Sequence, residues 1–325
     1  MLQLFRQNTI ATAIAIILVA FLAKFKYLGM PPIAHTRLGN GFIIHFPFLD
    51  RWYQHHTTWY VFLSILLLLI IAMYCNNIVS KDKLLGQKNY FPALLFILTT
   101  SVMYEFNVLN MAMIANMVLL SNLDKCISLY HASLPRRKLF DIGIFASIAT
   151  MLYFPSILFI PFFLLFALVL RSISIKDVSA YLLGLALPWL FYFSLGYISR
   201  KSWWYKENFI DFSIQLPASI PNGMQLLLVS ILFIALFVYA LYMKNKLTNR
   251  FSISIRKKWS IIMIYLFVTI PCGIVASQFP SYPWILFLTP FSILLSYTFL
   301  HHKEKYNIFT LYLFIAVLVC IQWLL

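Results

Sequence analysis

Acidic residues are scarce in this chain. Only nine of its 325 residues are Asp or Glu, and charged residues make up 10% of it. Soluble domains carry about a quarter charged residues. A chain with so few charges lacks the polar surface to face water on all sides. The scarcity of charge therefore excludes an ordinary soluble domain and indicates a protein whose solvent is a lipid bilayer.

Cysteine, glycine and compact catalytic motifs are also sparse. The four cysteines (Cys75, Cys126, Cys272 and Cys320) lie in or beside apolar runs without paired spacing, so they indicate neither a disulfide framework nor a redox motif. The nine glycines form none of the spacings that cradle a nucleotide phosphate. The chain contains no HExxH, CxxC or Gly-x-Ser-x-Gly motif. We therefore expect no cofactor and no metal, and no motif identifies an activity directly.

Apolar residues, by contrast, form 62% of the chain and recur in long, continuous runs. Continuous rather than alternating runs favour helices over a β-barrel. We predict an all-α, polytopic transmembrane helix bundle of about 11 spans, forming a single integral membrane domain over residues 1–325. The predicted spans are 8–28, 58–79, 90–105, 108–128, 139–154, 155–171, 178–198, 224–243, 259–279, 283–300 and 306–325. The pair 139–171 turns on "YFPS", so a kinked or re-entrant pair is an alternative there.

The basic residues predict the orientation of the bundle. The first apolar run is followed by Lys24 and Lys26 with no small-x-small cleavage site, which favours a retained span over a signal peptide. With the N-terminus inside, eighteen of the 25 Lys and Arg fall on cytoplasmic segments, and seven fall on two outer loops. This bias predicts a cytoplasmic N-terminus and a periplasmic C-terminus. The net charge of +16 then reflects orientation and contact with membrane lipids, and we expect no nucleic-acid partner.

Two outer loops are long enough to contain a site, about 29–57 and 199–223. The first contains "HTRLGNGFIIHFPFLDRWYQHH", whose histidines are ten, ten and one residues apart, a poor spacing for a metal. Its "FIIHFPFL" segment is apolar enough to dip into the interface, and a plain interfacial loop is the alternative to a site. The second loop mixes aromatic and charged residues, which suits a helix at headgroup depth or the entrance for a lipid-borne substrate.

The acids divide in the same way. Asp82, Asp124, Asp141, Asp177 and Glu304 lie close in sequence to Lys or Arg, which predicts solvated pairing at cytoplasmic helix ends. The acids on the predicted outer side are Asp50, Glu105, Glu207 and Asp211. Glu105 lies in a tight turn between two spans. Either it is exposed there, or the turn is sunk into the bundle and Glu105 is a buried acid with a function.

Three segments carry a resemblance to a known family: residues 110–130, 136–193 and 290–300. Their recurring features are the Asp141–Gly143 helix start, the Phe154–Pro155 turn, and a span containing Gly184 and Pro188. The chain resembles an uncharacterised family of multi-span inner-membrane proteins of the Bacteroidota, a domain of unknown function. The resemblance implies a Gram-negative inner membrane and a periplasmic outer side. It brings no activity and no site residues.

The clustering of candidate groups on the outer side gives the working hypothesis. It is an enzyme of cell-envelope glycan or lipid assembly that uses a polyprenyl-phosphate-linked substrate at the periplasmic face. Such an enzyme needs cations for the phosphate and a base for the acceptor hydroxyl. The candidate cations are Arg37, Arg51, Arg200 and Lys201, and the candidate bases are Glu105, Asp50, His45 and Asp211.

The architecture looks like that of the large membrane glycosyltransferase superfamily, which has a long first outer loop. It departs from that pattern because the first acid after the first span, Asp50, comes late, so a ligase-like or polymerase-like variant fits better. Two alternatives stay open. One is a non-enzymatic membrane subunit of an envelope or secretion assembly, with a membrane protein partner. The other is a transporter or flippase, for which charged residues deep within spans are expected.

Overall fold

The computed structural model is all-helical over the residues it describes, which are 5, 9–29, 47–170, 172, 174–198, 223–247, 252–275, 284–301 and 316. The helices in chain order are α2 (Ile10–Gly29), α3 (Pro47–His55), α4 (Thr57–Lys81), α5 (Phe91–Ser101), η1 (Tyr104–Asn107), α6 (Met111–Ser128), η2 (Leu129–His131), α7 (Pro135–Leu152), η3 (Phe154–Leu158), α8 (Phe159–Leu170), α9 (Ile175–Ile198), α10 (Gly223–Leu247), α11 (Ile253–Val275) and α12 (Ile285–His301).

The helices follow the predicted apolar segments. Each of the first ten predicted segments overlaps a helix, and the eleventh, 306–325, lies outside the described residues apart from position 316. Within the described part of the chain, five helices are long and apolar enough to cross a membrane: α2, α4, α9, α10 and α11. Helices α5 and α12, and the η3–α8 segment, are apolar but shorter. The protein thus has the helices of a membrane protein, and the figure of about 11 spans stays a prediction.

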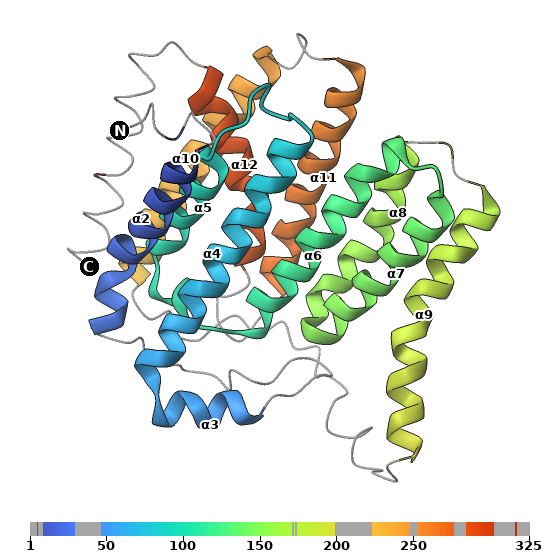
Figure 1. The fold of residues 1–325 in the computed structure, drawn as a ribbon, viewed down its shortest axis with the longest axis horizontal. Helices are drawn as coiled ribbons and strands as arrows, with labels where there is room; N and C mark the ends of the chain where they lie inside the picture. Colours follow the sequence, from blue (N-terminus) through green and yellow to red (C-terminus); the bar gives the residue numbers. More distant parts are fainter. Residues whose placement is uncertain are drawn as a thin grey trace.

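The helices pack side by side, with α2 on one flank and α9 on the other (Figure 1). Helices α4, α5, α6, α11 and α12 pack together through an apolar core between these flanks. Helix α3 lies across the end of α4 instead of beside it (Figure 1). The "YFPS" segment forms the 3₁₀ turn η3, which separates α7 from α8.

The backbones of helices α7 and α9 lie very close together at two glycines, Gly143 and Gly184. A Cβ on Gly143 would overlap the carbonyl oxygen of Tyr181, and a Cβ on Gly184 would overlap that of Phe140. Small residues at helix interfaces allow this kind of contact in a bilayer, where apolar side chains gain little by leaving lipid. The Gly143 and Gly184 positions therefore hold α9, an otherwise outlying helix, against the bundle.

One end of the bundle is tied together by ion pairs between different helices, and we call it the ion-pair end. The pairs are Lys81–Asp124 at 3.2 Å, Arg136–Asp177 at 3.3 Å and Lys258–Asp82 at 2.6 Å. They join α4 to α6, α7 to α9, and α11 to the residue that follows α4. Asp82, Asp124 and Asp177 pair with basic residues as predicted, but the Lys258–Asp82 pair is largely buried instead of solvated. Glu304 lies outside the described residues.

The cysteines behave as small core residues. Cys75, Cys126 and Cys272 are buried and not in disulfides, as predicted, while Cys320 lies outside the described residues.

Candidate functional site

The opposite end of the bundle contains the turn between α5 and α6, and we call it the turn end. The turn is not a surface hairpin, because Val102, Met103, Phe106, Asn107, Val108 and Leu109 are all buried. Glu105, in the 3₁₀ turn η1, is only 6% exposed. Of the two alternatives for Glu105, the sunken turn is the one observed. Irregular backbone at such depth is tolerated in a membrane only where protein covers it.

A lysine from the first helix reaches this turn. Lys24 of α2 is fully buried, and its Nζ donates to Thr100 Oγ1 at 3.1 Å and to Asn107 Oδ1. Thr100 lies in the last turn of α5 and Asn107 is the last residue of η1, so the two acceptors lie on either side of Glu105 in the sequence. Both acceptors are neutral. The cation is therefore held by side-chain dipoles from the two ends of the sunken turn.

Asn107 is the centre of the polar cluster. Its Nδ2 donates to the carbonyl oxygens of Thr100 at 3.1 Å and Met103 at 2.9 Å, and its own carbonyl accepts from the Ser64 hydroxyl. These bonds satisfy carbonyls that the end of α5 leaves without helical partners. The cluster thus joins α2, α4 and α5 to the turn.

Two tyrosines complete the support of the turn. Tyr60 of α4 donates to the Leu109 carbonyl, and Tyr27 of α2 donates to the Ser101 carbonyl at 2.8 Å. Side chains from α2 and α4 therefore fix the backbone before and after Glu105.

Helix α3 packs at the same end. The rings of Trp52 and Tyr53 contact the ring of Tyr60, with centroids 6.3 Å and 5.1 Å apart. Tyr60 in turn binds the turn that carries Glu105. Arg51, on α3, is exposed. The structure thus brings the helix of Arg51 and the turn of Glu105 together through Tyr60.

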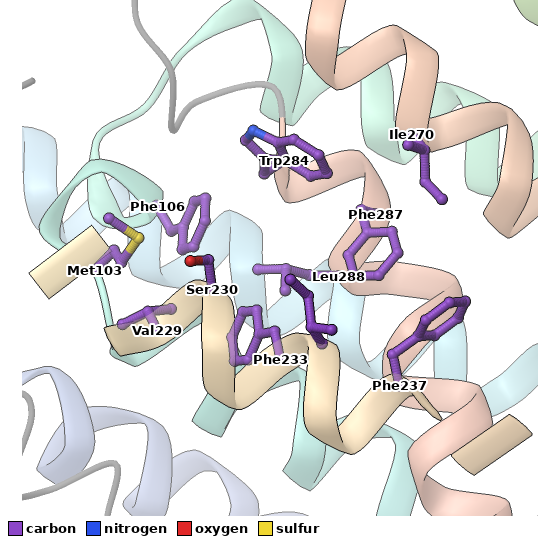
Figure 2. A pocket seen from close by; sticks show the side chains of 11 residues that line it. Met103, Phe106, Val229, Ser230, Phe233, Phe237, Ile270, Trp284, Phe287 and Leu288 are labelled. Atoms are coloured by element: carbon purple, nitrogen blue, oxygen red, sulfur yellow. The ribbon is translucent and has the colours of Figure 1, made fainter. Parts of the chain in front are cut away.

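An apolar pocket of 420 Å³ lies on the other side of the turn, between α10, α11 and α12 (Figure 2). Its walls are Met103, Phe106, Val229, Ser230, Phe233, Ile234, Phe237, Ile270, Trp284, Phe287 and Leu288. The Ser230 hydroxyl donates to the Leu227 carbonyl within α10, so it satisfies its own helix. Met103 and Phe106 flank Glu105 in the chain. One turn therefore forms part of both the polar cluster and the pocket wall. The volume falls in the range of ligand pockets, about 300–1,000 Å³.

The remaining candidates are placed only in part. Asp50 lies in α3, next to Arg51. His45, Arg37, Arg200, Lys201 and Asp211 lie outside the described residues. Among the residues that the structure describes, no three His, Cys, Asp or Glu side chains lie together as metal ligands would.

Sequence reasoning missed Lys24, which it assigned to an outer loop together with Lys26. The signal was present in the spacing: the buried residues of α2 are Thr12, Ile16, Ala20, Lys24 and Tyr27. Residues three or four apart share one face of a helix. Lys24 continues the buried stripe, whereas Lys26 falls off it.

The sequence comparison assigns the chain to a family. Residues 38–324 match a family of unknown function, DUF6427. The chain belongs to this family. No curated protein and no solved structure matches it significantly. The family description names no activity, so function has to be argued from the site.

Proposed function

We propose that this protein is an inner-membrane enzyme of cell-envelope glycan or lipid assembly, acting at the periplasmic face on a polyprenyl-phosphate-linked substrate. The observation that carries the proposal is the position of Glu105. A buried carboxylate lies in a turn whose neighbouring residues, Met103 and Phe106, line an apolar pocket. A lipid-linked substrate needs this pairing, because its hydrocarbon chain requires an apolar wall and its reacting end requires polar groups.

The pocket supports a hydrocarbon chain as its occupant. Its one hydroxyl in the wall, Ser230, is bonded within its own helix, and aromatic rings supply much of the rest. Pockets of this composition bind through apolar contact, and polar groups at their edge set the orientation. Met103 and Phe106 place the turn that carries Glu105 at the wall of this pocket.

The chemistry assigned to Glu105 is that of a general base. An acceptor hydroxyl gives its proton to the carboxylate while its oxygen bonds to the sugar carbon. The bond from that carbon to the phosphate oxygen breaks, and the electron pair leaves with the polyprenyl phosphate. Four basic residues are candidates for binding the phosphate. Arg51 is the one of them that lies among the described residues, and the others are Arg37, Arg200 and Lys201. Asp50 and His45 stay alternative bases in the loop that contains α3.

Two substitutions in the native bacterium test the proposal, Glu105→Gln and Arg51→Ala. Each should lower the envelope glycan product and raise its polyprenyl-linked precursor in lipid extracts analysed by mass spectrometry. Arg137→Ala, which removes an exposed cation from the ion-pair end, is the control and should change neither pool. Normal amounts of product and precursor in both variants, at normal protein levels, would overturn the enzyme hypothesis and favour the non-enzymatic membrane subunit.

A flippase is the second candidate, and one observation favours it. Lys24 is a cation buried within a candidate membrane span, as transport pathways require. A flippase forms no new bond. Purified protein in liposomes would then move a polyprenyl-linked sugar between leaflets without converting it, whereas the enzyme converts it when an acceptor is present.

A further inference from the structure

We infer that Lys24 is a positioning residue, whose ammonium orders the Tyr104–Asn107 turn and so sets the place of Glu105. The inference rests on the proposed function for the role of Glu105. The ordering of the turn itself is measurable without any substrate.

The burial of Lys24 is the first argument. Placing an ammonium in a low-dielectric interior is costly, and both acceptors found for it are neutral. A well-packed apolar residue in such a place is often as stable or more so. A contribution to folding stability alone therefore does not explain why a lysine occupies this buried position. Its acceptors show what the cation does, because Thr100 and Asn107 bracket the turn.

The direction of the Asn107 amide is the second argument. An ammonium only donates, so the atom of Asn107 that faces Lys24 has to be Oδ1. The amide nitrogen then points the other way, toward the carbonyls of Thr100 and Met103. The two carbonyls favour this orientation by themselves, and the bond from Lys24 to Oδ1 adds a third interaction that the reversed amide would lose. Lys24 thus reinforces the amide orientation that holds the turn against the end of α5.

The position of the turn matters on both of its sides. Met103 accepts from Asn107 through its carbonyl and lines the pocket with its side chain. A turn that loosens at Asn107 therefore displaces a wall of the pocket as well as Glu105. The lysine acts on both through the backbone between Thr100 and Leu109.

Hydrogen–deuterium exchange of the full-length protein in detergent tests this inference. Lys24→Met should speed exchange at residues 102–110 by about tenfold or more, because the turn opens locally, while the thermal midpoint stays within a few degrees. Lys24→Gln, which keeps an N–H donor without the charge, should restore part of the slow exchange. Lys138→Met is the matched control. Lys138 also donates to two neutral acceptors, the Oγ and carbonyl oxygen of Ser128, at the ion-pair end. It should leave residues 102–110 unchanged.

Two outcomes would overturn the positioning role. One is wild-type exchange at 102–110 in Lys24→Met. The other is faster exchange throughout the bundle with a large fall in the thermal midpoint, which indicates a structural role only. In cells, Lys24→Met should raise the same lipid-linked precursor as Glu105→Gln. If Glu105→Gln leaves the precursor normal, the proposed function fails, and the exchange data still decide whether Lys24 orders the turn.

Discussion

The two ends of the bundle use lysine in different ways. At the ion-pair end, Lys81 binds Asp124 with its own side chain 53% exposed. At the turn end, Lys24 is fully buried and binds a threonine hydroxyl and an asparagine amide. Water and lipid headgroups can solvate the first lysine. Only the protein solvates the second.

The difference separates two uses of charge. Exposed ion pairs contribute about 0–1 kcal/mol, so the Lys81–Asp124 pair adds little to stability. Basic residues at such an end instead favour the cytoplasmic side of a membrane. A buried ammonium is costly and persists where it orders other groups. We therefore propose that the ion-pair end sets the orientation in the membrane and that the turn end contains the functional site.

Removing the centre of the turn-end cluster should have the largest effect. Asn107→Ala deletes an acceptor of Lys24 and the amide bonds to the Thr100 and Met103 carbonyls, so a buried cation loses compensation. We expect a loss of about 3–5 kcal/mol in unfolding free energy, measured by denaturation in mixed micelles. Asn110→Ala is the control, because it removes the helix cap of α6 and a bond to the Val108 carbonyl without removing an acceptor of Lys24, and it should cost about 1 kcal/mol. Equal losses in the two variants would contradict a special role for the Lys24 cluster.

Lys258→Met should have an intermediate effect. Its partner Asp82 lies 2.6 Å away, and the two side chains are 6% and 13% exposed. This pair is therefore less accessible to solvent than the other two pairs at the ion-pair end. We expect a loss of about 2 kcal/mol, since the carboxylate left behind is only partly solvated. The same denaturation series measures it. If the loss of unfolding free energy is as small as that for an exposed pair, burial does not determine how much an ion pair contributes at this end of the bundle.

Lys81→Met should have the smallest effect. The Lys81–Asp124 pair is exposed, so its removal should cost less than about 0.5 kcal/mol and less still in high salt. Denaturation at two salt concentrations checks both statements. A loss above about 2 kcal/mol, insensitive to salt, would remove the contrast between the ends.

The sequence predicted the helices well, because membrane-spanning helices are specified locally by apolar length. It predicted pairing of Asp82, Asp124 and Asp177, although the observed partners come from distant parts of the chain. Such partners depend on which helices are neighbours, and local charge spacing does not contain that information. The exposure of Glu105 was undecidable for the same reason. It depends on α2 and α4 covering the turn, through Lys24, Tyr27, Tyr60 and Ser64.

The most direct test of this division of roles is the side of the membrane on which each end lies. Gln54 of α3 and Gln87 of the loop after α4 are both exposed, at the turn end and the ion-pair end respectively. Each is replaced by cysteine and treated with a membrane-impermeant maleimide in spheroplasts. The account predicts that Gln54→Cys is labelled in intact spheroplasts and Gln87→Cys only after lysis. Labelling in the reverse order would contradict it.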